Sequence, residues 1–267
     1  MERCIDFKGA NCYYQVHGKG KTIMLVHGFI EEGSMWDGLV STLKKSYTVI
    51  VPDLPGFGKS PLVVNELSMD WYSECIHEIV KAEKTKKLIL LGHSMGGYVA
   101  LNFAEKYGSV LTGFGLINSH CFADTPLKKE NRLRGIEFIK EHGTSVFIKE
   151  LYNSIFHESF KKKNRKLIDA LIVKAQKYTP EALMRANAAM MNRQDKSEVL
   201  KNTKVPVLFV NGEEDESAPV VYTLKQASYP RNADFHLFGS CKHMSIFERK
   251  PETIKIISAF CARTLGP

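Results

Sequence analysis

Short apolar runs alternate with segments of helical spacing along most of this 267-residue chain, and that alternation strongly restricts its fold. The strand-like runs lie at 21–29, 47–52, 87–92, 110–118, 205–212 and 233–239. Helical spacing occurs at 34–43, after Ser68, after Ser94, at 219–228 and at 251–265. Two further alternating segments, at 4–7 and 11–16, read as a hairpin around Gly9. Strands that are apolar on both faces and separated by helices belong to parallel sheets covered on both sides. We therefore predict an α/β fold with a mostly parallel, eight-stranded sheet flanked by helices.

Residues 120–204 interrupt this alternation with helical patterns rich in Lys and Glu and with no strand between them. One of these helices begins clearly, with Thr179 as N-cap and Pro180 in the first helical position. Open α/β sheets bind their ligands at the carboxyl ends of the strands, so an insertion there would cover the site. We predict a core of 1–119 and 205–267 with a helical cap, or lid, at 120–204.

The motif Gly92-His93-Ser94-Met95-Gly96 places a serine between a strand-like run and a helix. This matches G-x-S-x-G, the sharp turn that presents a nucleophilic serine in a strained backbone conformation. Glycine is needed two residues to either side, because a side chain there would collide with the neighbouring strand and helix. The alternative is an ordinary turn serine before a helix, but the flanking strand and helix patterns favour a nucleophile.

A serine hydroxyl needs a base to accept its proton and a third group to orient that base. In this architecture the acid and then the histidine follow the serine along the chain. Of nine histidines, His243 alone lies in a loop after the last strand and before the final helix. We therefore predict His243 as the base, which makes it a catalytic residue together with Ser94.

The acid is sought in the loop that follows the strand at 205–212. The segment Gly212-Glu-Glu-Asp-Glu-Ser-Ala-Pro219 carries four carboxylates, of which Asp215 is placed to turn inward while its neighbours stay in solvent. Asp124, in the loop after the preceding strand, is the weaker alternative. We predict Asp215 as the third catalytic residue.

Several nearby residues have simpler explanations than catalysis. His27 and His93 are expected to be structural hydrogen-bonding groups. Cys241 is expected to be a small buried thiol, and Met190 and Met191 are expected to fill space within the cap. The segment that follows Asp53, PGFGKS, lacks the spacing of a phosphate-binding loop and is expected to form a tight turn.

Composition excludes several functional classes. The formal net charge is +8, from 37 Lys and Arg against 29 Asp and Glu, but the basic cluster at 161–166 has no interleaved aromatic residues. We expect a solvated helix face and no nucleic-acid partner. The six cysteines show no metal-binding spacing, which predicts reduced thiols and no metal. No signal-like or membrane-spanning run is present, so we expect a cytoplasmic protein without a membrane partner.

Five motifs resemble, in order, those of the α/β-hydrolase superfamily. They are LVHGF at 25–29, VPDLPGFGKS at 51–60, GHSMGG at 92–97, VPVLFVNGEED at 205–215 and KHMSIFERKP at 242–251. The resemblance spans the chain outside the cap and is to the lid-bearing, cofactor-free esterases. The segment 190–215 is also similar to the lactonase, carboxylesterase and perhydrolase branch.

This resemblance implies a serine hydrolase that forms an acyl-enzyme on a small ester-like substrate, without a cofactor. It also implies that the backbone N–H groups of Phe29 and Met95 form the oxyanion hole. A serine at position 94 argues against dehalogenase and epoxide hydrolase chemistry, which use a carboxylate nucleophile. The alternatives on the same three residues are a lactonase, a thioesterase, a C–C bond hydrolase or a perhydrolase. A ligand-sensing protein with slow turnover is the alternative outside the enzymes.

Overall fold

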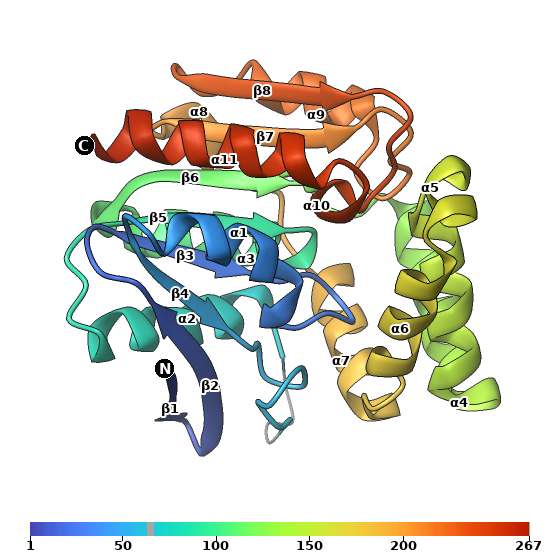
Figure 1. Ribbon diagram of the computed structural model, residues 1–267. Helices are drawn as coiled ribbons and strands as arrows, with labels where there is room; N and C mark the ends of the chain where they lie inside the picture. Colours follow the sequence, from blue (N-terminus) through green and yellow to red (C-terminus); the bar gives the residue numbers. More distant parts are fainter. Residues whose placement is uncertain (63–66, 267) are drawn as a thin grey trace.

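The computed structural model describes residues 1–62 and 67–266 and contains one eight-stranded sheet (Figure 1). The strands are β1 (Glu2–Phe7), β2 (Ala10–His17), β3 (Thr22–Val26), β4 (Thr48–Pro52), β5 (Leu88–His93), β6 (Leu111–Ile117), β7 (Val207–Gly212) and β8 (Ala233–Phe238). Their order across the sheet is β1-β2-β4-β3-β5-β6-β7-β8. The β1–β2 and β2–β4 pairs are antiparallel and all other pairs are parallel, which confirms the predicted sheet.

From β3 onward, every connection between consecutive strands contains at least one helix. The core helices are α1 (Asp37–Leu43), α2 (Met69–Ala82), α3 (Met95–Tyr107), α9 (Val220–Ala227), α10 (Ser245–Glu248) and α11 (Lys250–Leu265). Between β6 and β7 lie α4 (Pro126–Ile155), α5 (Glu158–Lys163), α6 (Arg165–Ala175), α7 (Pro180–Met191) and α8 (Ser197–Asn202). Two 3₁₀ turns, η1 (Gly33–Trp36) and η2 (Gly108–Val110), complete the described helical structure. The segment predicted as one helix at 34–43 is thus a 3₁₀ turn that leads into α1.

Both faces of the sheet are buried, which explains why the parallel strands are apolar throughout. Successive side chains of a strand point to opposite faces. In β3, Ile23 and Leu25 pack in the cluster that contains residues of α1 and α11, whereas Met24 and Val26 pack with residues of α2 and α3. The α1–α11 and α2–α3 pairs therefore form the two outer layers (Figure 1).

Local capping signals begin the helices where the sequence predicts. The hydroxyl of Ser68 accepts a hydrogen bond from the Trp71 N–H at the start of α2. The hydroxyl of Thr179 does the same for the Ala182 N–H at the start of α7. Each bond satisfies one of the N–H groups that have no partner within a helix.

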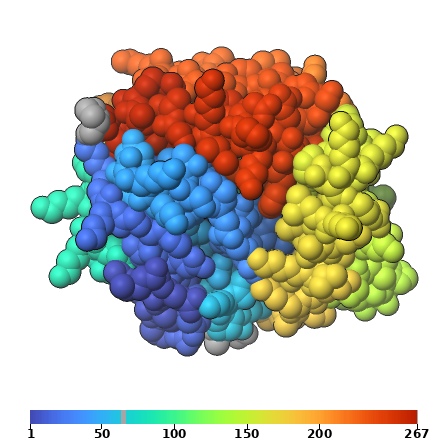
Figure 2. All heavy atoms as spheres, viewed as in Figure 1, coloured from blue at the N-terminus to red at the C-terminus, as the bar shows by residue number. Residues whose placement is uncertain are grey.

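Helices α4 to α7 lie beside the carboxyl ends of the central strands (Figure 1). Helix α4 is two helical segments joined at Gly143, whose φ of 78° is outside the helical region. The space-filling view shows the yellow atoms of this region against the blue and red atoms of the core (Figure 2). Helix α8 packs instead on α3 of the core. Within the described residues, no helix is both long and apolar enough to cross a membrane.

Candidate active site

Ser94 lies at the turn between β5 and α3 in a strained backbone conformation. Its φ of 50° and ψ of −115° are unusual for a residue with a side chain. The flanking glycines permit this turn, as predicted. A Cβ on Gly92 would lie 2.1 Å from the Gly96 carbonyl oxygen, and one on Gly96 would lie 2.4 Å from the Val26 carbonyl oxygen. The turn therefore packs backbone directly against backbone.

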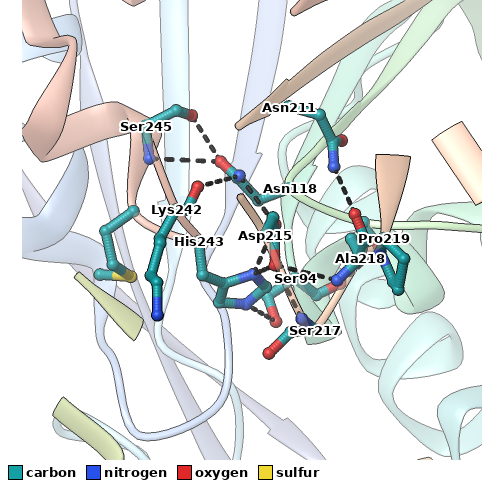
Figure 3. Close-up of polar contacts among 12 residues, drawn as sticks. Ser94, Asn118, Asn211, Asp215, Ser217, Ala218, Pro219, Lys242, His243 and Ser245 are labelled. Atoms are coloured by element: carbon teal, nitrogen blue, oxygen red, sulfur yellow. Dashed lines mark hydrogen bonds and ion pairs between the residues drawn. The ribbon is translucent and has the colours of Figure 1, made fainter. Parts of the chain in front are cut away.

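The structure brings Ser94, His243 and Asp215 into one hydrogen-bonded chain (Figure 3). His243 Nε2 lies 2.8 Å from Ser94 Oγ, and His243 Nδ1 lies 2.9 Å from each carboxylate oxygen of Asp215. The three residues follow β5, β8 and β7 respectively, at the carboxyl ends of these strands. They come together because β5, β7 and β8 end at the same edge of the sheet, with only β6 between β5 and β7, although the residues are far apart in the sequence.

Asp215 is buried and is held as a carboxylate by several donors. Burial opposes its ionisation, but the His243 ring and the surrounding donors outweigh that effect, so the pKa of Asp215 lies below its ordinary value. Its Oδ1 accepts hydrogen bonds from the backbone N–H groups of Ser217 and Ala218, each at 2.9 Å. An ionised Asp215 can only accept, so Nδ1 of His243 carries a proton and Nε2 is the ring nitrogen that faces Ser94.

Asn118 joins the loops that carry the acid and the base, and sequence reasoning missed it. Its amide nitrogen donates to Asp215 Oδ2 at 3.0 Å and to the Lys242 carbonyl at 3.1 Å. Its amide oxygen accepts from the Ser245 N–H and hydroxyl (Figure 3). Asn118 has a φ of 48°, a left-handed conformation that asparagine tolerates better than most residues. An asparagine directly after a buried strand was the available signal.

The alternative acid, Asp124, forms ion pairs with two arginine side chains. Its carboxylate lies 2.5 Å from Arg132 Nε and 2.7 Å from Arg193 Nη1, and it makes no hydrogen bond to a histidine within the described chain. Burial opposes its ionisation, but the two guanidinium groups hold its pKa below the ordinary value. Asp124 thus belongs to an ion-pair cluster in the α4–α7 region.

Glu31 and His93 form a second buried polar pair beneath Ser94. His93 Nδ1 lies 2.9 Å from Glu31 Oε2, and His93 Nε2 lies 2.9 Å from the His243 carbonyl oxygen. Glu31 Oε2 also accepts from the Gly28 N–H at 2.8 Å. The pair connects the Gly28 loop with the backbone of His243. His93 is structural, as expected, but nothing in the sequence identified Glu31 as its partner.

Burial alone would suppress charge on both members of this pair. Their mutual attraction outweighs burial, so the pKa of His93 is raised and that of Glu31 is lowered. The geometry agrees, because each ring nitrogen of His93 faces an acceptor and only an imidazolium can donate at both positions.

A cavity of about 190 Å³, here called the nucleophile cavity, opens above Ser94 and His243. Its apolar lining includes Phe29, Phe147 and Met190. Met190 is buried and lines this cavity, so it does more than the predicted filling of space. An adjoining cavity of about 500 Å³ shares six lining residues with it: Lys128, Asn131, Leu151, Ile155, Ser217 and His243.

Two backbone N–H groups close to the nucleophile cavity lack an acceptor among the described residues. No described residue accepts a hydrogen bond from the N–H of Met95, the first residue of α3, or from that of Phe29. Phe29 lines the nucleophile cavity and precedes Ile30, which has a φ of 61°. The N–H of Met95 is one of the first N–H groups of α3, which have no partner within a helix.

Two other residues have the structural roles that were expected. His27 is fully buried, and its Nε2 accepts a hydrogen bond from the Leu54 N–H at 2.8 Å. Burial raises the pKa of the Cys241 thiol, and Cys241 is buried as predicted. Among the residues that the structure describes, no group of three or more His, Cys, Asp or Glu side chains could hold a metal ion.

Comparison with known proteins gives a consistent result. Residues 21–250 match the family model described as alpha/beta hydrolase fold. A 2-hydroxy-6-oxo-6-(2'-aminophenyl)hexa-2,4-dienoic acid hydrolase of Metapseudomonas resinovorans is 26% identical over 98% of this chain and 91% of its own. A pimeloyl-[acyl-carrier protein] methyl ester esterase of Wigglesworthia glossinidia brevipalpis is 27% identical over 78% of this chain and 80% of its own.

A solved structure extends the similarity over the complete fold. The malate-bound thermophilic esterase of Thermogutta terrifontis superposes with a TM-score of 0.92 at 26% identity, and the match covers 99% of each chain. The similarity therefore includes the α4–α7 region as well as the sheet.

Proposed function

Because this chain belongs to the alpha/beta hydrolase fold family and is a hydrolase, we propose that it is a serine hydrolase that cleaves small carboxylic esters through an acyl-enzyme. The catalytic residues in this proposal are Ser94, His243 and Asp215. The observation that carries it is the 2.8 Å contact between His243 Nε2 and Ser94 Oγ on a strained strand-to-helix turn.

In the proposed first step, Ser94 Oγ attacks the ester carbonyl carbon while His243 Nε2 accepts the hydroxyl proton. The tetrahedral intermediate collapses, and His243 returns that proton to the leaving alcohol. In the second step His243 takes a proton from water, which attacks the acyl-enzyme carbonyl. The C–Oγ bond then breaks, His243 returns the proton to Ser94 Oγ, and the acid is released. Asp215 keeps the ring in the required tautomer and stabilises the imidazolium that forms in each step.

We assign the oxyanion hole to the N–H groups of Phe29 and Met95. Neither N–H group has an acceptor among the described residues. This supports the proposal that both are available to donate hydrogen bonds to the oxyanion that forms during the reaction. Met95 is also the first residue of α3, where the helix dipole favours a negative charge. Such prealigned donors stabilise the transition state more than the ground state.

The size of the nucleophile cavity supports a small acyl group. A water molecule takes up about 30 Å³ in the liquid. A cavity of about 190 Å³ beside Ser94 therefore suits a small acyl group, and the adjoining cavity of about 500 Å³ offers room for further substrate atoms. We assign the covering role to α4–α7, since residues of α4 and α7 line this cavity, and we leave α8 with the core.

Activity on p-nitrophenyl acetate and butyrate tests the proposal. The wild type should show a burst of p-nitrophenol followed by steady turnover, and a fluorophosphonate probe should label it. Ser94→Ala should lose the label and about 10⁴-fold or more in kcat. Ser228→Ala, at the surface end of α9, is the matched control and should retain both. Absence of turnover and labelling in the wild type would favour the ligand-sensing alternative instead.

The second candidate is cleavage of a carbon–carbon bond on the same three residues. Its support is the Metapseudomonas resinovorans relative, whose name describes an oxo-substituted dienoic acid and no ester. A faster reaction with a vinylogous 1,5-diketone acid than with any ester would favour this candidate. Lactone and thioester substrates of matched acyl length in the same assay would distinguish the lactonase and thioesterase alternatives.

A further inference from the structure

One face of α4 presents polar side chains to the cavities where a packing helix would present apolar ones. Lys128, Asn131, Arg132 and Gly135 follow the spacing of a single helix face, and all of them line the nucleophile cavity. The apolar lining includes Phe29 of the core and Phe147 of the second segment of α4. The first segment of α4 therefore brings polar side chains to a cavity that also has apolar walls.

The guanidinium group of Arg132 already donates hydrogen bonds to other side chains. Its Nε contacts Asp124 Oδ2 at 2.5 Å, and its Nη1 contacts Asn187 Oδ1 at 2.9 Å. The half-buried Lys128 differs, because its ammonium makes no hydrogen bond or ion pair with any described residue. Lys128 also lines both cavities, so its charge lies at the boundary between them.

The described carboxylates around these cavities form no ion pair with Lys128, although Asp124 and Asp215 attract it at longer range, and each lining carboxylate has another cationic partner. Glu31 pairs with His93, Asp124 with Arg132 and Arg193, and Glu216 with Lys242. Burial, together with the repulsion from Arg132, lowers the pKa of Lys128. A negative group bound beside Lys128 would relieve both effects.

The wider charge distribution points in the same direction. Residues 120–204 contain 18 Lys and Arg against 10 Asp and Glu, a net charge of +8 that equals that of the whole chain. The remainder of the protein is therefore neutral, and the positive charge is concentrated on the segment that contains α4–α8. The field of this charge attracts anionic small molecules toward the cavity and weakens with added salt.

We propose that Lys128 binds a carboxylate of the substrate, so that the preferred substrates are small esters carrying a carboxylate a few atoms from the reacting carbonyl. The inference rests on the proposed serine hydrolase function and specifies its substrate class. The carboxylate can belong to the acyl part or to the alcohol part of the ester, and both lie within reach of the two connected cavities.

Two pairs of esters test the proposal and distinguish these placements. Monoethyl adipate and ethyl hexanoate have acyl chains of equal length that differ in the terminal carboxylate. The acetyl ester of 5-hydroxypentanoate and pentyl acetate provide the same comparison on the alcohol side. The measured quantity is the ratio of kcat/KM for the anionic ester to kcat/KM for the neutral one.

The wild type should prefer the anionic ester in one pair, and Lys128→Gln should reduce that ratio about tenfold, the effect of losing one charged hydrogen bond. Lys129→Gln removes an exposed charge one residue away and should leave the ratio unchanged. A ratio that Lys128→Gln does not alter, or that both variants reduce equally, would overturn the proposal. A ratio is insensitive to partial misfolding, which lowers both rates together.

A binding measurement separates this inference from the proposed function. Calorimetric titration of monoethyl adipate into Ser94→Ala and into Ser94→Ala with Lys128→Gln requires no turnover. We expect about tenfold weaker binding in the double variant. If the wild type hydrolyses none of the four esters, the proposed function fails, while equal binding by the two variants would overturn the role of Lys128.

Discussion

The imidazole of His93 has an acceptor at each ring nitrogen. These two hydrogen bonds link the Gly28 loop with the loop that carries His243, and the proposed reaction depends on both loops. Through Glu31 the imidazole holds the N–H of Gly28, which precedes Phe29, and through its other nitrogen it holds the carbonyl of His243. Breaking a buried ion pair from one side leaves an uncompensated charge. Glu31 and His93 are therefore positioning residues whose removal should alter both stability and rate.

Glu31→Gln should destabilise the protein by about 3 kcal/mol and lower kcat more than it raises KM. Because the pKa of His93 is raised in the folded protein, its contribution to the free energy of unfolding is complete below pH 6.5. That contribution is lost as the pH rises through the folded-state pKa. Because the pKa of Glu31 is lowered, its contribution to the free energy of unfolding is complete above pH 4.5 and is lost as the pH falls. Urea unfolding of wild type and variant should therefore differ most between pH 4.5 and 6.5.

Glu213→Gln, an exposed change after β7, is the matched control and should behave like the wild type across this pH range. A Glu31→Gln stability difference that does not vary with pH would show that the pair is not ionised in the folded protein.

The turn from β5 to α3 depends on the close approach of the Gly96 backbone to the end of β3. A Cβ on Gly96 would lie 2.4 Å from the Val26 carbonyl oxygen and 2.6 Å from that of His27. Both atoms belong to the backbone, which cannot move aside as a flexible side chain could. The geometry of the serine turn is thus set by the packing of three elements.

Gly96→Ala should destabilise the protein by about 2–4 kcal/mol because of this overlap. Gly108→Ala is the control: its Cβ would meet nothing within 4 Å, and its φ of −56° suits any residue. That variant should be neutral or slightly stabilising. Thermal and urea unfolding of both proteins measure the contrast, and equal stabilities would contradict this account of the turn.

Several contacts attach the α4–α7 region to the Ile30–Glu32 segment of the core. The hydroxyl of Tyr152 donates to the Ile30 carbonyl and that of Tyr178 to the Glu31 carbonyl, each at 3.1 Å. Lys174 and Lys177 each lie 2.5 Å from a carboxylate oxygen of Glu32. Because Phe29 directly precedes this segment, movement of the helices should affect the proposed oxyanion site.

Glu32→Gln should weaken this attachment, with a loss of about 1 kcal/mol at pH 7 for a half-exposed ion-pair network. Burial opposes its ionisation, but the two lysines outweigh it and lower the pKa of Glu32 to about 2. The contribution of Glu32 to the free energy of unfolding is therefore complete above pH 4.5 and declines as the pH falls toward 2. Hydrogen exchange of α6 should be faster in the variant at pH 7, and the difference should shrink at pH 3.

Glu198→Gln removes an ion pair that lies within α8 and is the control for this measurement. It should leave the exchange of α6 unchanged. Equal exchange rates in wild type and Glu32→Gln would contradict the role assigned to Glu32.

Local patterns were sufficient to predict the sheet and most helices. The continuous apolar runs of the parallel strands, the Ser68 and Thr179 caps and the glycines around Ser94 are short-range signals, and each corresponds to the described structure. The chain order of Ser94, Asp215 and His243 also selected three residues that lie in hydrogen-bond contact. Their catalytic role stays a prediction until the substitutions above are measured.

Local sequence patterns indicated the strands and most core helices, because capping, periodicity and glycine sterics act over a few residues. They could not identify Glu31 as the partner of His93, Asn118 as the link between Asp215 and Lys242, or Lys128 as a cation without a partner. Hydrogen bonds and ion pairs depend on which distant side chains meet after folding. That meeting is decided by the order of strands in the sheet and by the placement of α4–α7 over its edge.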